Sequence, residues 1–466
     1  MMWHLTEFQD RTAAISETDV ITYGELMDQS PGLLSHLPDR CLIFNLSANT
    51  IGALFGYVTF LNSGRVQLML DENLDADLLR NLIKAYHPEY LWIPREKRNE
   101  LPYDCVAEWY GYVLLKTGLK PYPLHKDLAL LLTTSGSTGS PKLVRQTYQN
   151  IRSNAESIVE YLEITNEERP ITTLPMNYTY GLSVINSHLL KGATILLTNK
   201  GLMQKEFWEF FKKQQATSIA GVPYTYEMLK RLRFFRMELP SLTTMTQAGG
   251  KLSPELHKEF AEYAKETGKH FVVMYGQTEA TARMSYLPSQ RSLEKCGSMG
   301  IAIPGGRFDL VDENGNTISE PEVTGELIYT GPNVTPGYAE CGDDLIKGDE
   351  RHGVLITGDM AKRDSDGYYY IVGRKKRFLK IFGNRVNLDE TERLIKAAFP
   401  DTECACIGKD DHMTICITTP DNQGAIRAFI SQKTGLNHAA FQVKPMDQIP
   451  KNDAGKTLYA KLEEEL

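Results

Sequence analysis

The sequence predicts an α/β protein with a large N-terminal domain of helix-flanked sheets, a β-rich subdomain and a small α+β C-terminal lid domain. Strand-sized apolar segments alternate with helix-sized segments along the first part of the chain, which is typical of a sheet covered by helices. From residue 297 to 372, short strand segments lie between Gly, Asp and Asn turns, which predicts hairpins. The basic cluster Lys375–Arg377 separates this section from a new αβ pattern. We therefore expect domains at 1–375 and 376–466, with the β-rich section at about 297–372.

The large domain is expected to contain a long series of strands and helices. The expected strands include Leu42–Asn45, Val66–Leu70, Leu91–Ile93, Leu128–Leu132, Ile171–Leu174, Ala193–Leu197, Ser218–Val222, Met245–Ala248 and Phe271–Met274. The expected helices include Thr50–Leu61, Asn150–Leu162, Leu182–Leu190, Phe207–Gln215 and Tyr224–Phe235. Several of the later strands end in glycines and polar residues. In open α/β sheets, ligands bind at these carboxyl ends of the strands.

An anion-binding loop is predicted directly after the apolar strand Leu128–Leu132. Its glycines remove the Cβ atoms that would hold a ligand away from the backbone, and N–H groups, four hydroxyls and a lysine form a cradle for a polyphosphate. A flexible Ser/Gly linker is the alternative, but linkers do not normally follow a buried strand directly. The loop is not a Walker loop, because Pro141 precedes the lysine and Leu143 follows it. The cradle residues are Thr134, Ser135, Gly136, Ser137, Thr138, Gly139 and Lys142.

Composition excludes several classes of function. The net charge of −8 comes from 51 basic and 59 acidic residues without a basic stripe, so we expect no nucleic-acid partner. Seven cysteines without CxxC pairs argue against a zinc site and for a reducing compartment. The N-terminus lacks the basic-then-apolar order of a signal peptide, and the apolar window Ile51–Leu61 is too short to span a bilayer. We therefore expect a cytoplasmic protein with no membrane span.

Several motifs in a fixed order together resemble one family. They are the Ser/Gly loop, Gly249-Gly250-Lys251, Tyr275-Gly276-Gln277-Thr278-Glu279, Thr357-Gly358-Asp359, Gly373-Arg374 and a tail segment ending in Gly455-Lys456. The chain resembles the adenylate-forming superfamily, which contains acyl-CoA synthetases, adenylation domains of peptide synthetases and beetle luciferases. The resemblance extends from Thr22 to Lys456. A lone Thr-Gly-Asp is usually a turn, and Thr278-Glu279 alone could be a helix-start capping pair. Each therefore supports the resemblance only together with the other motifs.

The resemblance implies a reaction in two halves. A carboxylate attacks the α-phosphate of ATP to give an acyl-adenylate and pyrophosphate, and a thiol then captures the acyl group. The Ser/Gly loop with Lys142 would hold the β- and γ-phosphates, and the backbone at Gly249, Gly250 and Lys251 would meet adenine. In the motif Tyr275, Gly276, Gln277, Thr278 and Glu279, the tyrosine ring would pack on adenine, Thr278 would bond the α-phosphate and Glu279 would hold Mg²⁺, a cation that prefers oxygen ligands.

The family pattern implies further roles in the last third of the chain. Asp359 and Arg374 would bind the ribose. Lys456 would be catalytic with Thr278 and Glu279, because it would bridge the carboxylate and the α-phosphate. Lys376 falls on the family's hinge position. The implied motion is a large rotation of the mobile lid domain between the two half-reactions.

The substrate acid is less defined by the sequence. Residues 177–183 contain no acidic side chain that would pair with a substrate ammonium, which disfavours α-amino acids because an unpaired buried ammonium is costly. The candidate pocket residues are Tyr178, Tyr180, Val222 and Gln247, with core packing as the alternative for the tyrosines. The acceptor thiol is either coenzyme A or the phosphopantetheine of a separate acyl or peptidyl carrier protein.

Three functions remain open on the sequence alone. The first is an ATP-dependent, Mg²⁺-dependent acid–thiol ligase that acts on a small carboxylic acid. The second is a stand-alone amino-acid adenylation enzyme that loads a carrier protein. The third is a nucleotide-binding paralogue without catalysis, against which Glu279 and Lys456 argue.

Overall fold

The computed structural model describes residues 3–133, 142–381, 384–409, 411–434, 436–451 and 457–465. The chain divides into two compact units. Unit 1 comprises Met1–Arg307 with Tyr329–Leu355, and unit 2 comprises Phe308–Ile328 with Ile356–Leu466. The expected boundary after Lys375 stays a prediction. Among the described residues, no helix is both long enough and apolar enough to cross a membrane.

The described part of unit 1 contains a nine-stranded sheet whose central strands are parallel. Its order is β16-β15-β14-β13-β12-β10-β11-β1-β2. Neighbouring strands β12, β13 and β14 run in register, so that Gly221, Gln247 and Val273 lie side by side near their carboxyl ends. The strand bounds are β1 Thr12–Ile15, β2 Val20–Thr22, β10 Pro170–Ile171, β11 Ile195–Leu196, β12 Ser218–Gly221, β13 Thr244–Gln247, β14 His270–Tyr275, β15 Ser285–Leu287 and β16 Ile301–Ala302.

A second sheet in the described part of unit 1 has eight strands in the order β19-β9-β8-β4-β3-β5-β7-β6. Strands β8, β4, β3 and β5 are parallel, and antiparallel strands flank them. All six residues of β3 are buried, as expected for a parallel strand covered on both faces. The strand bounds are β3 Leu42–Ser47, β4 Val66–Asp71, β5 Tyr90–Pro94, β6 Asp104–Trp109, β7 Tyr112–Lys116, β8 Leu128–Thr133, β9 Leu143–Thr147 and β19 Gly337–Ala339.

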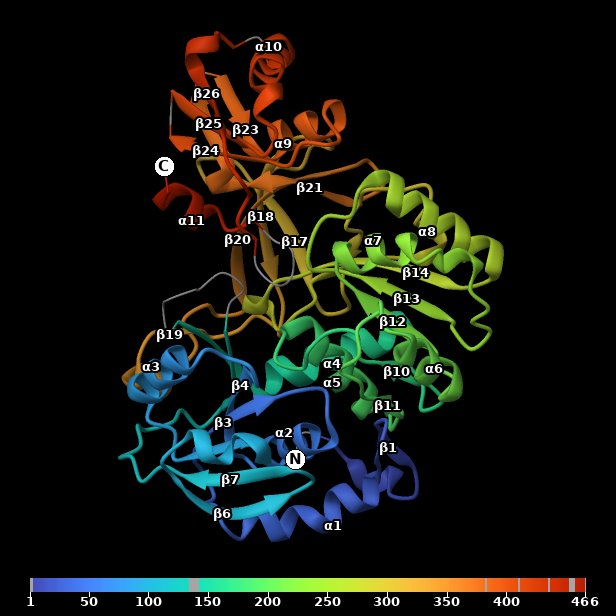
Figure 1. Cartoon of the computed structure of the whole chain (residues 1–466), viewed down its shortest axis with the longest axis vertical. Coiled ribbons are helices and arrows are strands. Elements are labelled where there is room, and N and C mark those ends of the chain that lie inside the picture. The colour runs from blue at the N-terminus through green and yellow to red at the C-terminus, as the bar shows by residue number, and fades with distance from the viewer. Residues whose placement is uncertain are drawn as a thin grey trace. The chain divides into compact units, whose positions relative to one another are not determined.

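Helices cover the two sheets of unit 1 (Figure 1). Beside β13 and β14 lie α7 and α8, and Tyr226 of α7 packs edge-on against Phe260 of α8 and Phe271 of β14. The α4 helix begins after a capping box in which Thr147 and Asn150 satisfy each other's backbone N–H groups. The helix bounds in this unit are α1 Tyr23–Leu34, α2 Ile51–Asn62, α3 Ala76–Tyr86, α4 Tyr148–Leu162, α5 Thr179–Leu190, α6 Lys205–Lys213, α7 Pro223–Arg231 and α8 Pro254–Thr267.

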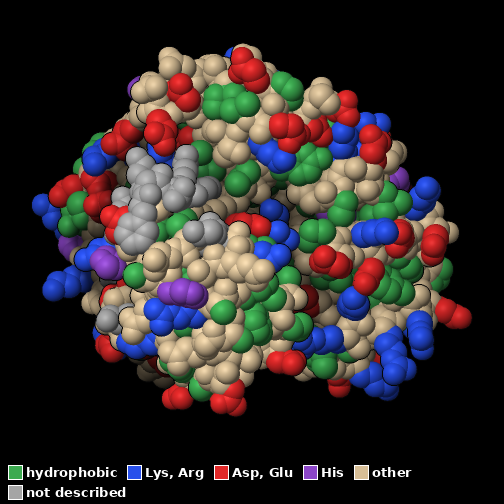
Figure 2. All heavy atoms as spheres, turned by 90° about the horizontal axis from the view of Figure 1, so that it is seen from above, with side chains coloured by type: hydrophobic (Ala, Val, Ile, Leu, Met, Phe, Trp, Pro, Cys, Tyr) green, Lys and Arg blue, Asp and Glu red, His purple; other side chains and the backbone are tan. Residues whose placement is uncertain are grey.

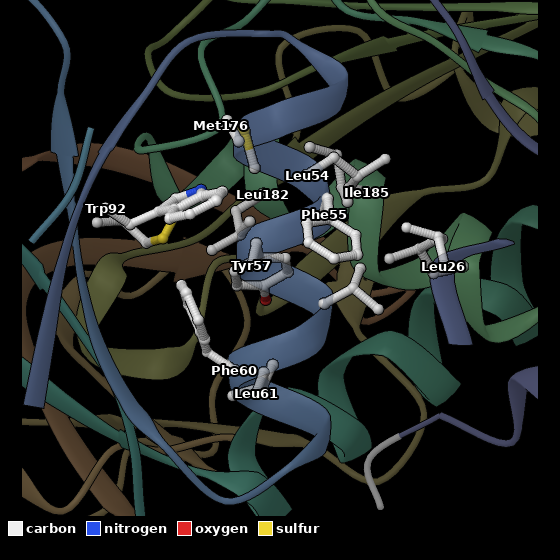
Figure 3. Packing of buried hydrophobic residues seen from close by; sticks show 14 of the residues in the cluster. Leu26, Leu54, Phe55, Tyr57, Phe60, Leu61, Trp92, Met176, Leu182 and Ile185 are labelled. Atoms are coloured by element: carbon white, nitrogen blue, oxygen red, sulfur yellow. The ribbon is translucent and has the colours of Figure 1, made fainter. Parts of the chain in front are cut away.

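The main core of unit 1 surrounds α2, whose residues Ile51–Leu61 are all buried. Figure 3 shows side chains of this helix among residues of α5 and the eight-stranded sheet. Trp92 of β5 lies against the helix, where its Nε1 donates to the carbonyl oxygen of Gly52 over 3.0 Å. A Cβ at Gly56 would lie 2.3 Å from the same Nε1 atom, so only glycine allows this approach. The expected apolar helix is therefore central to the fold.

Unit 2 contains three smaller sheets and three helices in its described residues. The four-stranded sheet has the order β17-β18-β20-β21, and β20 pairs with β21 in antiparallel fashion. Helices α9 and α10 pack on β24, β25 and β26 through a core of aliphatic side chains and cysteines. The bounds are β17 Arg307–Val311, β18 Gly325–Thr330, β20 Val354–Arg363, β21 Tyr369–Arg374, β22 Phe378–Ile381, β23 Asn384–Asn387, α9 Leu388–Ala398, β24 Cys404–Lys409, β25 His412–Ile417, α10 Gln423–Thr434, β26 Phe441–Pro445 and α11 Tyr459–Glu464.

The predicted α/β fold class is confirmed, with local differences. The strand β9 follows the Ser/Gly segment and pairs antiparallel with β8, so that Thr133 opposes Leu143. The sequence does not predict β9, because the five residues of this strand do not distinguish it from a loop. The expected strand Ile171–Leu174 is only Pro170–Ile171, since the next ladder donor, the Thr198 N–H, bonds the Thr172 hydroxyl over 2.9 Å and not a backbone carbonyl.

We predict that His257 makes the stability of unit 1 depend on pH. This α8 side chain is buried, which lowers its pKa from 6.5 to about 4. The unfolded chain therefore binds a proton more readily than the folded chain between these values, so folding stability falls as the pH drops from 6.5 to 4, by up to about 3 kcal/mol. Urea unfolding of His257→Gln at several pH values should show a flatter slope in this window. His270→Gln, at an exposed histidine, is the matched control, and an unchanged slope in His257→Gln would contradict the prediction.

Candidate functional site

The segment that follows β14 has a backbone path that requires glycine. A Cβ at Gly276 would lie 1.6 Å from the carbonyl oxygen of Ala282. The chain turns back through Thr281 and Ala282, whose φ angles of 57° and 105° are left-handed. The Met284 N–H then donates to the Tyr275 carbonyl oxygen over 2.9 Å. This tight turn presents the short helix η4, Thr278–Ala280, at the carboxyl end of the sheet.

Glu279 is held at both its backbone and its carboxylate. The N–H and hydroxyl of Thr335 both donate to the Glu279 carbonyl oxygen, over 3.0 and 2.9 Å. Nη1 of Arg351 donates to the Thr335 hydroxyl over 2.6 Å and to the same carbonyl oxygen over 3.3 Å. The Tyr338 hydroxyl donates to Oε1 of Glu279 over 2.7 Å. The expected metal ligand is therefore oriented before any ligand arrives.

Lys142 lies beside the same tyrosine. Its Nζ is 3.8 Å from the centre of the Tyr338 ring and 3.7 Å from Oε1 of Glu340. Tyr338 belongs to β19, where it pairs with Val144 of β9, the strand that starts next to Lys142. One ring thus connects the lysine expected to bind phosphate with the carboxylate expected to bind Mg²⁺. The other cradle residues, Thr134 to Gly139, lie outside the described residues.

The electrostatics around Tyr338 keep its hydroxyl protonated. Burial, and then the nearby Glu279 carboxylate, raise the tyrosine pKa to about 12. The hydroxyl is therefore a donor throughout the neutral range. The guanidinium of Arg351 lies 4.6 Å from the ring centre, so two cations, Lys142 and Arg351, contact the aromatic ring.

We predict that Tyr338→Phe raises the Mg²⁺ concentration that the enzyme requires and has a smaller effect on folding stability. The variant keeps the ring for both cations but removes the donor to Glu279. Because a hydrogen bond to a charged group contributes about 1.5–3 kcal/mol, the Mg²⁺ concentration for half-maximal ATP–pyrophosphate exchange should rise about 10-fold or more. Tyr57→Phe, which removes a buried hydroxyl bonded to Asn186, is the control. An unchanged Mg²⁺ requirement in Tyr338→Phe would show that Glu279 does not depend on this donor.

The residues expected near adenine and the acyl group are brought together at the end of β13. Gly249 has a left-handed φ of 82°, and a Cβ there would lie 2.6 Å from the Tyr178 hydroxyl and 3.0 Å from Val222. The buried Gln247 donates from Nε2 to the carbonyl oxygens of Ala248 and Gly250, over 3.2 and 2.9 Å. Gln247 thus supports the turn at Gly249 and Gly250. Its assignment to the substrate pocket stays a prediction.

Tyr180 lies deeper than Tyr178. Its hydroxyl is 2.8 Å from the Thr246 hydroxyl, and its ring centre is 6.4 Å from that of Tyr178. Tyr180 belongs to an apolar cluster with Leu174, Ala220, Val222, Ala248, Val272 and Met274. Tyr178 is partly buried and packs against this cluster. The two tyrosines therefore occupy successive layers of one wall.

The expected ribose-binding pair lies within unit 2. Asp359 and Arg374 are register partners on β20 and β21, and Nε of Arg374 is 2.7 Å from Oδ1 of Asp359. The Asp359 side chain is 3% exposed, whereas that of Arg374 is 59% exposed. The Thr357 hydroxyl accepts from the Asp359 N–H over 3.0 Å, which orients the aspartate. Sugar hydroxyls would have to displace part of the arginine contact.

The lysine expected to be catalytic, Lys456, lies outside the described residues, but both flanks of its segment are described. Lys451 and Thr457 form an antiparallel bridge. Downstream, the Tyr459 hydroxyl donates to Glu392 over 2.9 Å, and the Arg377 guanidinium lies 3.8 Å from the Tyr459 ring centre. Tyr459, on the described C-terminal flank, is thus tied to Arg377, next to the expected hinge residue Lys376. The backbone of Lys376 belongs to the short helix Lys375–Arg377, and its side chain is not described.

A single carboxylate is a suitable partner for Mg²⁺ bound to ATP. The described residues contain no group of three or more His, Cys, Asp or Glu that could hold a metal ion. Magnesium usually keeps several waters and binds through one or two carboxylates together with substrate phosphates. Glu279, beside Lys142 and on a rigid turn, fits this mode. Elsewhere on the protein, Figure 2 shows basic and acidic side chains interspersed on one face.

The sequence analysis did not identify three residues of this site, Thr335, Tyr338 and Arg351. They belong to a Gly- and Pro-rich segment that was expected to be part of the β-rich section. The sequence signal that could have identified them is a glycine followed by a tyrosine, Gly337-Tyr338, at the start of a strand in a segment with few apolar residues. Their role depends on contacts with Glu279, which is more than 50 positions away in the chain.

Comparisons with known proteins show what the chain is similar to. A family model described as AMP-binding enzyme matches residues 2–339. Oxalate–CoA ligase from Arabidopsis thaliana is 29% identical over 348 residues, which are 71% of this chain and 66% of that enzyme. The long-chain-fatty-acid–CoA ligase of Escherichia coli O157:H7 is 29% identical over 370 residues, 74% of this chain and 63% of that enzyme. The chain thus spans less than two thirds of the length of these relatives.

Among solved structures, O-succinylbenzoate coenzyme A synthetase from Bacillus subtilis in complex with AMP has a TM-score of 0.79 to this chain. The two proteins are 22% identical, and the superposition covers 98% of this chain and 97% of that one. At this identity the similarity supports the fold, including the presence of a C-terminal subdomain.

Proposed function

The chain belongs to the family of AMP-binding enzymes, and on this premise we propose that it is an acid–thiol ligase that forms AMP. It would activate a carboxylic acid with ATP and transfer the acyl group to a thiol. The observation that carries the proposal is the contact of Lys142 and Glu279 with opposite parts of Tyr338. This contact supports the proposal, because it brings a candidate cation for phosphate oxygens together with a candidate carboxylate for Mg²⁺.

The first half-reaction is nucleophilic substitution at phosphorus. A carboxylate oxygen of the acid attacks the α-phosphorus of ATP, the bond from that phosphorus to the bridging oxygen breaks, and pyrophosphate leaves with the electron pair. Two anions approach each other in this step, so positioning and positive charge supply most of the catalysis. Lys142 would stabilise the leaving pyrophosphate, Thr278 would bond the α-phosphate, and Lys456 would neutralise charge between the two reactants.

The second half-reaction makes the thioester. The thiol sulfur attacks the acyl carbon and loses its proton to solvent, the bond from that carbon to the phosphate oxygen breaks, and AMP leaves with the electron pair. The relatives named above are CoA ligases, which favours coenzyme A as the acceptor. The phosphopantetheine of a separate carrier protein is the alternative acceptor. These two relatives are named for oxalate and for long-chain fatty acids, so family membership does not identify the acid.

The proposal is tested by ATP–pyrophosphate exchange with a panel of carboxylic acids and amino acids. We expect Mg²⁺-dependent exchange with at least one non-amino acid, followed by thioester formation when CoA is added. Exchange with amino acids alone would favour a stand-alone adenylation enzyme. Tight ATP binding without exchange for any acid would contradict the ligase assignment and indicate a nucleotide-binding paralogue.

Cellular location is a separate proposal. The scattered cysteines are free in the described residues, and several are buried in the core of unit 2. Free thiols at these positions support a reducing, cytoplasmic compartment. We also infer that the enzyme has no nucleic-acid partner, because its net charge is −8.

A further inference from the structure

Among the described residues, the buried side chain of Arg283 has only neutral hydrogen-bond partners. Arg283 is 2% exposed and follows the turn that carries Glu279. Its Nε donates to the Ser183 hydroxyl over 3.1 Å, and its Nη1 donates to the Tyr161 hydroxyl over 3.2 Å. Its guanidinium also lies 5.1 Å from the centre of the Tyr180 ring. Two helices and one turn of unit 1 therefore surround this charge.

No carboxylate neutralises Arg283 among the described residues. Glu168 lines the same cavity, but its carboxylate accepts a hydrogen bond from Thr217 and forms no ion pair with the arginine. His188 also lines the cavity, and burial lowers its pKa to about 4, so it is neutral at pH 7. The arginine remains protonated in a protein, so the site has a net positive charge.

A buried charge without a counter-ion is costly for folding. Buried charges in proteins are normally paired, and the remaining guanidinium hydrogens of Arg283 have no acidic partner here. The hydroxyl oxygens of Tyr161 and Ser183 accept hydrogen bonds from the guanidinium but do not cancel its charge. A ligand with a negative charge would supply the missing partner, and a planar guanidinium suits a carboxylate in particular.

The cavity beside Arg283 adjoins the residues that are expected to contact the substrate acid. The narrow cavity that it lines shares Ala220 with the apolar cluster of Tyr180 and Val222 and also touches Leu162 and Val184, which pack on that cluster. The same cluster reaches Tyr178, whose hydroxyl adjoins Gly249. One apolar cluster therefore contacts both Tyr178, beside the Gly249 turn, and the cavity that Arg283 lines.

We propose that the substrate acid carries a second, distal carboxylate, which forms an ion pair with Arg283 while the first carboxylate is activated. This inference rests on the proposed ligase function. The cavity is narrow, so the distal group must be compact, as a carboxylate is. Tyr161 and Ser183 orient the guanidinium, and the cluster around Tyr180 packs against the carbon chain.

The test compares straight-chain dicarboxylic acids with the monomethyl esters of the same acids in ATP–pyrophosphate exchange. Each ester keeps one carboxylate for activation and matches the length of its diacid. A site that leaves a buried charge unpaired rejects the analogue strongly, so we expect at least one diacid to exceed its monoester in kcat/KM on the order of 100-fold or more. This comparison needs no variant and so does not depend on how Arg283 substitutions fold.

Variants of Arg283 then test whether its guanidinium causes the preference for diacids over monoesters. In Arg283→Gln the ratio of diacid to monoester should fall to near one, and Arg283→Lys should restore part of it. Arg65→Gln is the matched control, since Arg65 is a buried arginine of unit 1 that pairs with Asp39 outside the pocket. That control should keep the wild-type ratio even if it lowers the melting temperature.

Each result supports or overturns the inference. Equal use of diacids and monoesters, or a preference for monoacids, would overturn the second carboxylate and leave the ligase function intact. Parallel loss of both substrates in Arg283→Gln, with the ratio unchanged, would show that the arginine is only structural. Absence of exchange with every acid would overturn both the inference and the proposed function.

Discussion

Lys456→Ala should abolish ATP–pyrophosphate exchange, whereas Lys142→Ala should raise the KM for ATP more than it lowers turnover. The two lysines act on different parts of the reaction. Lys456 would neutralise charge where the carboxylate meets the α-phosphate, which exists only as the transition state forms. Removing such a stabilising group lowers kcat on the order of 1,000-fold.

Lys142 would act on the leaving group and on bound ATP alike. Its Nζ contacts the Tyr338 ring and approaches Glu340, so the side chain is held near the loop before ATP binds. An interaction present in both the ground state and the transition state changes KM more than kcat. Loss of one charged contact should raise the KM for ATP about 10-fold.

Steady-state exchange kinetics of both variants, with ATP and acid varied separately, measure these effects. Lys451→Ala is the control for Lys456→Ala, because Lys451 is an exposed lysine nearby that pairs with Glu403. It should leave exchange within a few-fold of wild type. A larger kcat loss in Lys142→Ala than in Lys456→Ala would mean that the roles of the two lysines are reversed.

Gly276→Ala should inactivate the enzyme and destabilise unit 1. The added Cβ would lie 1.6 Å from the Ala282 carbonyl oxygen and 2.6 Å from its carbonyl carbon, both backbone atoms that cannot rotate away. The turn must therefore shift, and with it Thr278, Glu279 and Arg283. A displacement of about 1 Å at a reacting centre costs on the order of 100-fold in rate, and overpacking costs about 1–3 kcal/mol of stability.

Urea unfolding and exchange assays on Gly276→Ala separate the two effects. Gly201→Ala is the matched control in the same unit, because the atom nearest to its added Cβ is the flexible end of Gln204 at 4.0 Å. That control should be close to wild type in both assays. Full exchange activity in Gly276→Ala would show that the turn does not position the expected α-phosphate and metal residues.

Much of the fold follows from local patterns in the sequence. The apolar run of α2 and the strands around it are predicted from hydrophobicity and length, since burial on all sides demands continuous apolar residues. The motifs predict the family because each one consists of particular residue types at short spacing, and because the motifs follow one another in the family's order. Both kinds of signal are contained in a few neighbouring residues.

Other elements escaped prediction because they depend on distant partners. The strand β9 is stabilised by pairing with β8 and β19, and its own sequence does not distinguish it from a loop. The roles of Thr335 and Tyr338 likewise depend on Glu279, which is far away in the chain. Sequence spacing carries no information about which segments the sheets bring together.

The fold class, the family motifs and the residues expected to bind ATP follow from the amino-acid sequence alone, because these are local or ordered features. The tertiary structure adds that Tyr338 connects Lys142 with Glu279 and that Arg283 is buried with no acidic partner among the described residues. In the sequence, Arg283 is one arginine among many charged residues. Its environment comes from Tyr161, Ser183 and Tyr180, which lie about 100 or more positions away, and long-range packing alone sets the charge balance of that pocket.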